Sequence, residues 1–364
     1  MRKNTNNCIP RFAKTLFLLA ASSFLVSLFA RKNTSFAEWV SSEIGYRIRR
    51  VLATSTSSFS VSLGEALIVL SPVIVIFVLV MAARRTDAKS RIRFLSGFLA
   101  LLSLFYTGYV YTLGVGYHRE RLEDMLSIHE SEVNAESLYR TAERLNAECK
   151  DLLDEISFAE SGSSLSDISF SDMSEEMIVG YDRLIADYPE LNMRNFNSSA
   201  KAVHFSEAMT SLDLLGVYTY FTGESNVNVH YPDYTIPFTV AHEMAHQRGI
   251  ARENEANFTA FLVCIRADSV YVRYSAYMNM LEYVASALYK TDKALYRTLV
   301  ATYDNRLKGE INAYREFYLA NKNDTLGKIS DTVNDNYLKA QGTEGVVSYG
   351  LVVRLCVSYY DSMK

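Results

Sequence analysis

Residues 237–262, PFTVAHEMAHQRGIARENEANFTAFL, contain the pattern that decides the fold of the chain. His242, Glu243 and His246 form an HExxH motif, in which two imidazoles four residues apart share one face of a helix. Two such imidazoles can hold one metal ion, with the glutamate between them next to a metal-bound water. Gly249 predicts the end of this helix, and a second helix rich in carboxylates is expected to start within four residues. The sequence therefore predicts two consecutive helices that bring three ligands to one metal ion, for which we expect Zn²⁺.

Two glutamates of the second helix compete for the third ligand position. Glu253 and Glu255 are two residues apart, so they point to nearly opposite sides of a helix and only one can face the histidines. The segment resembles thermolysin-like zinc peptidases, whose third ligand opens the pattern E-x-x-[SA]-D on a second helix. Residues 253–257, ENEAN, match it with Asn257 at the aspartate position, where an amide oxygen can still accept a hydrogen bond from an imidazole. We therefore favour Glu253 as the ligand and Asn257 as the group that orients a ligand histidine.

Three hydrophobic stretches precede this segment. Residues 66–83 carry no charge over 18 residues and residues 94–117 carry none over 24, so each can cross a hydrocarbon core of about 30 Å. Residues 15–30 are shorter, and we expect an uncleaved anchor there rather than a signal-peptide core, because no clear cleavage site follows. The sequence thus predicts a membrane region of residues 1–117 with three transmembrane helices, at about 13–30, 63–83 and 94–115.

Basic residues at the ends of these stretches predict the orientation of the chain. Residues 84–93, RRTDAKSRIR, hold five Arg and Lys against one Asp, and the N-terminal 14 residues add four more, so both segments are expected in the cytoplasm. Basic residues within 31–62 weaken this assignment without reversing it. We therefore predict a multi-pass protein of the cell membrane, with the lipid bilayer as a partner and residues 118–364 as an extracytoplasmic domain.

The extracytoplasmic part has the composition of a mostly helical domain. Apolar residues at helical spacing predict helices in 118–160, in 175–187 and almost throughout 238–364, with a polar loop at 161–174. Between residues 200 and 234, the segments KAVHF, GVYTYF and NVNVHY predict short strands. The expected class is therefore α+β and mostly helical, a zincin-like domain with a small β-sheet and an HExxH helix.

Composition and charge exclude several other classes. A chain of 364 residues with 49% hydrophobic residues and only five prolines is neither disordered nor a disulfide framework. A net charge of −4, without a basic run in the C-terminal part, argues against a nucleic-acid partner. The four cysteines form no CxxC pair, so they predict neither a cysteine zinc site nor a redox motif.

The chain resembles a bacterial membrane family called domain of unknown function thirty-eight-ten. The resemblance is carried by the three hydrophobic stretches and by the segments GVYTYFTGESNVNVHYPDYTIPFT, HEMAHQRGIARENEANF and NYLKAQGTEGVVSYGLVVRL. This family is regarded as metallopeptidase-like because of its HExxH motif and has no established substrate. The resemblance therefore implies the fold and the membrane topology more strongly than an activity. The likeness to thermolysin-like peptidases covers only the two metal helices and is an analogy for mechanism.

The chemistry expected from these residues is metal-assisted hydrolysis of a peptide bond. With His242, His246 and Glu253 on zinc and one position open, Glu243 can act as the general base toward the zinc-activated water and pass the proton to the leaving amine. We therefore predict a membrane-anchored zinc metallopeptidase, a hydrolase with an unidentified peptide or protein substrate. Two alternatives stay open: a metal-binding membrane sensor or receptor without catalysis, and a zinc amidase that acts on a cell-wall component.

Further candidates lie on either side of the motif. Asn226 and Asn228 alternate on one face of the predicted strand pair, where they either hydrogen-bond an extended substrate or are ordinary outward-facing polar residues. Polarising the substrate carbonyl needs a further donor, for which Tyr349, His230 and His204 are candidates. A histidine in such an aromatic-rich segment is more often structural than catalytic.

Overall fold

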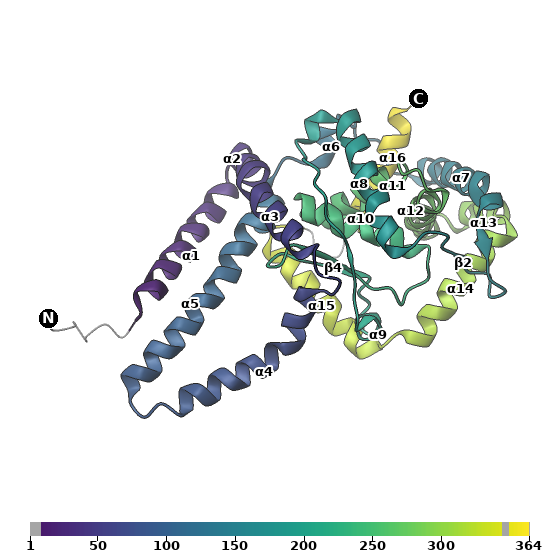
Figure 1. The fold of residues 1–364 in the computed structure, drawn as a ribbon. Helices are drawn as coiled ribbons and strands as arrows, with labels where there is room; N and C mark the ends of the chain where they lie inside the picture. The colour runs from purple at the N-terminus through teal and green to yellow at the C-terminus, as the bar shows by residue number, and fades with distance from the viewer. Residues whose placement is uncertain (1–8, 344–348, 364) are drawn as a thin grey trace.

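The computed structural model describes residues 9–343 and 349–363 and shows a mostly helical protein with two small β-sheets (Figure 1). Three long helices extend from one side of a larger helical body that carries the HExxH motif. The predicted class, mostly helical with small sheets, is therefore confirmed.

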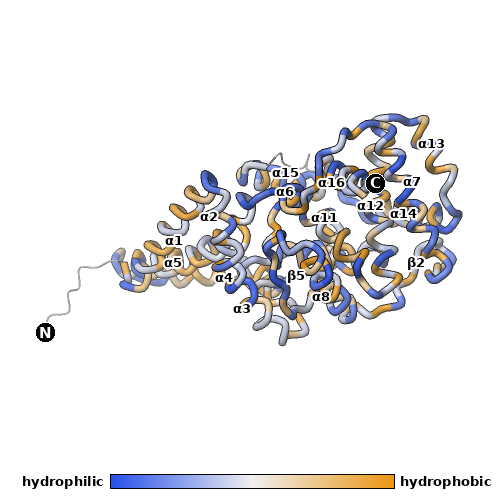
Figure 2. Tube along the Cα trace, turned by 90° about the horizontal axis from the view of Figure 1, so that it is seen from above, coloured by the Kyte–Doolittle hydropathy of each residue, from blue (hydrophilic) through white to orange (hydrophobic). Residues whose placement is uncertain are grey.

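Three helices are long and apolar enough to cross a membrane: α1 (Arg11–Ala30), α4 (Leu63–Ala83) and α5 (Ala88–Thr112), which continues into the 3-10 turn η2 (Gly114–His118). Most of their apolar side chains point outward, and Figure 2 shows hydrophobic residues along these helices. Such exposure is favourable only where the surrounding medium is hydrocarbon. The three predicted spans are thus present by length and composition.

The arrangement of the three spans is uneven. α1 and α5 pack side by side through small residues, including Ala13, Ser23 and Ala100, which allow a close approach of the two helices. α4 diverges from α5 after their short connection (Figure 1). The start of α1 and the α4–α5 connection lie at the same end of the group, away from the helical body.

The segment between α1 and α4 is folded into the body. It forms α2 (Thr34–Trp39), the π-helical turn η1 (Val40–Gly45) and α3 (Tyr46–Thr56). Within α3, the Arg49 side chain is only 1% exposed. Its guanidinium donates hydrogen bonds to the carbonyls of Ser41 at 3.0 Å, Thr112 at 3.1 Å and Arg248 at 3.5 Å. One side chain thus joins η1, the end of α5 and the end of the helix that carries HExxH.

The start of α4 is fixed to the body by two carboxylates. Glu224 accepts hydrogen bonds from the N–H groups of Leu63 and Gly64 at 3.0 and 2.7 Å, where the helix dipole favours a negative charge. In return, Glu65 accepts from the N–H groups of residues 204 and 205 at 3.0 and 2.7 Å. The first turn of α4 therefore lies directly against the larger sheet.

The larger sheet has three short strands in the order β3 (Lys201–Ala202), β5 (Glu224–Val227) and β4 (Gly216–Thr219). β5 pairs parallel with β3 and antiparallel with β4, so β4 is an edge strand. The segments predicted as strands correspond to this sheet, although β5 ends at Val227 and the second half of NVNVHY leaves it. A separate hairpin of β1 (Ser157–Phe158) and β2 (Ser164–Leu165) was not predicted.

The other helices surround the two helices of the metal motif, α10 and α11, which are almost fully buried.

α8 begins at Phe170, earlier than predicted, because the Ser169 side chain caps its first turn. The helices of the body and its short 3-10 turns are α6 (Leu122–Met125), α7 (Ala135–Leu152), η3 (Leu153–Glu155), α8 (Phe170–Asp187), η4 (Pro189–Leu191), α9 (Ser206–Thr210), α10 (Thr235–Arg248), α11 (Glu253–Cys264), α12 (Val270–Thr291), α13 (Lys293–Ala301), α14 (Asn305–Asn321), α15 (Asp324–Ala340) and α16 (Tyr349–Ser362).

Replacing Arg49 by methionine is expected to lower the free energy of unfolding by about 2–4 kcal/mol, because three carbonyls that it satisfies lose their donor. Arg47→Met is the matched control and is expected to change stability little, since the Arg47 side chain is 74% exposed. Thermal unfolding of the full chain in detergent measures both variants. Equal losses in the two would contradict the role given to Arg49.

A half-buried carboxyl on α12 predicts a dependence of stability on pH. Glu282 accepts a hydrogen bond from the Tyr234 hydroxyl at 2.9 Å, and burial raises the pKa of Glu282 to about 7. Because the folded-state pKa lies above the ordinary value, this carboxyl favours folding at low pH, and its contribution is lost as the pH rises through 7. We expect the wild type to lose about 2–3 kcal/mol between pH 5 and pH 8 from this group, and Glu282→Gln to avoid that loss. Denaturant unfolding at both pH values measures the difference, and identical pH profiles would refute it.

Candidate metal centre

The structure brings together the three side chains predicted as metal ligands. His242 and His246, one turn apart on α10, place their Nε2 atoms 3.1 Å from each other. Glu253, the first residue of α11, has its Oε2 3.3 Å from Nε2 of His242 and its Oε1 3.6 Å from Nε2 of His246. Ligands of tetrahedral zinc, each about 2.0–2.1 Å from the ion, lie roughly 3.3 Å apart, so the three groups fit such an ion.

The turn between the two helices produces this arrangement. Gly249 adopts a left-handed conformation with φ of +102° and ends α10, as predicted. The chain reverses there, and the Ile250 carbonyl comes within 2.7 Å of Nδ1 of His246. A proton on that Nδ1 donates to the carbonyl and leaves Nε2 free to bind a metal. The carbonyl of Ile250 is thus an orienting group that the sequence analysis missed, because a backbone atom leaves no signal in the sequence.

The second glutamate of α11 has a different role. Glu255 is buried, accepts a hydrogen bond from Arg252 Nη1 at 2.6 Å and another from the Leu122 N–H at 3.2 Å. It therefore points away from the two histidines, as the two-residue offset predicted, and holds the start of α11 against α6.

Glu243 lies under the edge strand of the larger sheet. A Cβ at Gly216 in β4 would come within 2.5 Å of Glu243 Oε1, so only glycine allows the strand to pass this close. Burial raises the pKa of Glu243, while the imidazoles of His242 and His246 act in the opposite direction. The backbone of Tyr218, from the same strand β4, also acts to lower the pKa of this carboxyl, and its Oε2 is buried without a hydrogen-bond partner among the described residues. A carboxyl with a raised pKa is suited to accept and return a proton near neutral pH.

The two histidines and Glu253 also interact electrostatically. Burial alone would lower the pKa of His246, but the neighbouring carboxylates of Glu253 and Glu243 outweigh it and raise this pKa to about 9. Although burial acts against it, the imidazoles hold the pKa of Glu253 well below its usual range. Without a metal, protonated His246 and ionised Glu253 therefore form an ion pair. Protons thus compete with a metal ion for the imidazole nitrogen of His246.

Two other candidates are not on an exposed strand face. Asn226 is buried and donates its amide to the carbonyl of Val217 at 3.2 Å. Asn228 is also buried and donates to the carbonyl of Leu214 at 2.9 Å. The suggestion that these amides bind an extended substrate is therefore wrong, because alternation along a strand does not tell which face is covered.

The candidates for a carbonyl-polarising donor are not brought to the metal ligands. His230 places Nδ1 3.1 Å from the Thr210 hydroxyl, and the His204 ring packs edge-on against Phe205. Among residues 9–343 and 349–363, the group that could hold a metal ion consists of His242, His246 and Glu253 and does not include His204 or His230. The side chain of Tyr349 lies outside the described residues.

The predicted orienting role of Asn257 stays a prediction. Its side chain is buried on α11, and the hydrogen bonds of the described residues include none between it and an imidazole. His246 uses the Ile250 carbonyl instead, whereas Nδ1 of His242 is buried without a partner in this part of the chain.

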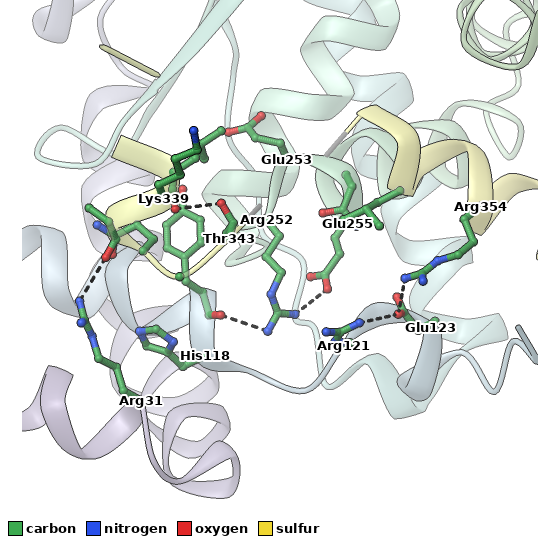
Figure 3. A pocket seen from close by; sticks show the side chains of 17 residues that line it. Arg31, His118, Arg121, Glu123, Arg252, Glu253, Glu255, Lys339, Thr343 and Arg354 are labelled. Atoms are coloured by element: carbon green, nitrogen blue, oxygen red, sulfur yellow. Dashed lines mark hydrogen bonds and ion pairs between the residues drawn. The ribbon is translucent and has the colours of Figure 1, made fainter. Parts of the chain in front are cut away.

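A cavity of about 620 Å³ opens beside Glu253 (Figure 3). Its walls come from the ends of α1 and η2, from α11, and from the C-terminal helices α15 and α16. Five cationic side chains face three carboxylates, namely Arg31, Arg121, Arg252, Lys339 and Arg354 against Glu123, Glu253 and Glu255. The cavity is therefore predominantly basic and lies close to the body-side end of α1.

Tyr117, which lines this cavity, is the first of three hydrogen-bonded tyrosine hydroxyls. Tyr117 donates to Tyr337 at 3.3 Å, and Tyr337 donates to Tyr109 at 3.2 Å. The three residues come from η2, α15 and α5, so no spacing in the sequence could have grouped them.

A family model described as Protein of unknown function (DUF3810) matches residues 41–357. The chain belongs to this family. The resemblance named from the sequence is thereby confirmed for the family. Neither the curated proteins nor the solved structures include a match. In this DUF3810 chain, the matched residues include α3, α4, α5 and both helices of the metal motif, so the spans α4 and α5 and the motif lie in one family unit, whereas α1 lies outside the match.

Metal analysis of the purified full DUF3810 chain distinguishes the two glutamates. His246→Ala and Glu253→Gln are expected to lose bound zinc, because each removes or weakens one of the three ligand groups. Glu255→Gln is the matched control: it should keep the zinc and lose about 1–3 kcal/mol of stability through its weakened pairing with Arg252. Inductively coupled plasma mass spectrometry and thermal unfolding measure the two effects. Zinc that survives in Glu253→Gln but not in Glu255→Gln would reverse the assignment.

Proposed function

We propose that the protein is a membrane-anchored zinc metallopeptidase. The observation that carries this proposal is the convergence of His242, His246 and Glu253 within 4.8 Å, next to the buried carboxylate of Glu243. Two imidazoles and one carboxylate leave a tetrahedral zinc ion one open position, which is typical of catalytic rather than structural zinc sites.

Each residue of the site has a defined part in this chemistry. When bound, zinc supplies a Lewis acid that polarises a carbonyl oxygen and acidifies water. His242, His246 and Glu253 hold the ion, and the Ile250 carbonyl fixes the ring of His246. The Glu243 carboxylate takes the proton of the attacking water and returns it to the nitrogen of the departing amine.

The neighbouring sheet supports a peptide as the substrate. β4 is an edge strand, and it passes directly over Glu243 at Gly216. An extended peptide can add to such an edge through backbone hydrogen bonds and so present one peptide bond to the carboxylate. The basic cavity beside Glu253 favours a substrate with an acidic group near the bond that is cleaved.

The arrangement of the spans supports an extracytoplasmic location of the site. The start of α1 and the α4–α5 connection lie at one end of the spans, and the body lies at the other end (Figure 1). Both of those segments are rich in Arg and Lys, which favours the cytoplasmic side for them.

A metal-binding sensor without catalysis is the second candidate. It is favoured by His242, whose Nδ1 has no hydrogen-bond partner among the residues that the structure describes, so one ligand lacks an orienting group. An amidase acting on a cell-wall component would use the same residues as the peptidase and would differ only in the substrate that it cleaves.

The test compares Glu243→Gln with the wild type. The full chain is reconstituted in liposomes and assayed with a mixture of quenched fluorescent peptides, some acidic and some neutral, alongside soluble cell-wall muropeptides. Glu243→Gln is expected to keep one zinc per chain and to lose about 10²–10⁴-fold in peptide hydrolysis, because the proton acceptor is gone. Glu207→Gln, an exposed carboxylate on α9, is the control and should keep full activity.

The possible outcomes separate the candidates. Removal of zinc with 1,10-phenanthroline should abolish hydrolysis, and added zinc should restore it. Zinc-loaded wild type that cleaves no peptide would refute the peptidase, and cleavage of the muropeptides alone would identify the amidase.

A further inference from the structure

The helix α15 is unusually exposed for a helix of this body. Gly327 and Leu338 are its buried residues. Gly327 packs against Asp213, because a Cβ added at Gly327 would lie 2.4 Å from the Asp213 carboxylate. Near the other end of the helix, the Tyr337 hydroxyl donates a hydrogen bond to the Tyr109 hydroxyl. Because most helical stability in proteins comes from the packing of an apolar face, the exposed apolar residues of this 17-residue helix are expected to meet a further surface.

One face of α15 carries an apolar stripe. Leu326, Ile329 and Val333 are 38%, 53% and 64% exposed, and their spacing of three and four residues places them on one face. Tyr337, four residues further on, continues this stripe. Lys328 lies nine residues before Tyr337 and therefore on the opposite face.

Contacts of Tyr337 show which way the stripe faces. Its ring packs edge-on against the ring of Tyr109 in α5, with 6.3 Å between centroids. Since Leu326, Ile329 and Val333 share the face of Tyr337, they point to the side of the molecule on which α5 lies.

Both ends of α15 lie next to the body-side ends of membrane spans. The Tyr337–Tyr109 contact places its last turns at the end of α5. At the other end, Asp213 follows α9, and residues 204–205, just before α9, bind Glu65 in the first turn of α4. In Figure 1, α4 and α5 diverge, and α15 runs between the regions where they join the body.

We propose that α15 lies flat on the bilayer between the body-side ends of α4 and α5, with Leu326, Ile329 and Val333 inserted at the boundary of headgroups and acyl chains. Because α4 and α5 are long and apolar enough to cross the bilayer, their body-side ends mark the height of the lipid surface. An amphipathic helix with exposed apolar residues on one face is suited to lie at this surface.

This placement has a consequence for the cavity beside Glu253. Residues 338–343, at the end of α15, form one of its walls. The cavity therefore opens next to the lipid surface, within reach of a substrate that is itself held at the membrane.

Site-directed spin labelling of the full chain tests the proposal. Val333→Cys is labelled in a Cys8→Ser background, because Cys149, Cys264 and Cys356 are buried. The chain is placed as single copies in lipid nanodiscs, and power saturation compares collisions with oxygen, which concentrates in lipid, and with a water-soluble nickel complex. Lys328→Cys on the same helix is the matched control.

At position 333, we expect collisions with oxygen to exceed those with nickel several-fold, and at position 328 we expect the opposite. Nickel access at 333 equal to that at 328 would overturn the proposal, because the stripe would then face water. Low access of both reagents at 333 would also overturn it, because a protein segment would cover the stripe. The readout requires neither zinc nor catalysis, so its failure leaves the proposed function untouched.

Discussion

The left-handed turn at Gly249 is the constraint on which the rest of the structure depends. It reverses the chain after HExxH, so that Glu253 meets the two imidazoles and the Ile250 carbonyl reaches His246. A side chain at this position would collide with Arg49, whose Nη2 would lie 2.5 Å from an added Cβ. The turn that brings the metal ligands together is therefore also the place where α3, from the segment between α1 and α4, packs against α10.

The metal centre and the membrane region are thus joined by several hydrogen bonds, two sets of which come from Arg49 and Glu224. Arg49 binds the end of α5 and the end of α10, and Glu224 binds the first turn of α4 from the sheet that covers Glu243. A change in the position of α4 or α5 would act directly on the residues around the site. Such coupling would suit an enzyme or a sensor whose partner lies in the bilayer.

Local patterns in the sequence were sufficient for much of this site. The spacing of HExxH, the glycine after it and the two-residue offset of Glu253 and Glu255 each depend on one turn of helix, and the structure has all three as predicted. The spans were equally visible, because hydrophobicity over about 20 residues needs no tertiary context. Local reasoning failed where contacts are distant in sequence: the burial of Arg49, the close approach of Gly216 to Glu243, and the covered face that holds Asn226.

X-ray absorption at the zinc edge, measured on the full chain with one zinc bound, tests the central claim most directly. A centre made by His242, His246 and Glu253 predicts only nitrogen and oxygen neighbours at about 2.0–2.1 Å, with the outer-shell scattering of two imidazole rings. A sulfur neighbour at about 2.3 Å, or scattering without imidazole, would place the metal elsewhere and contradict the account.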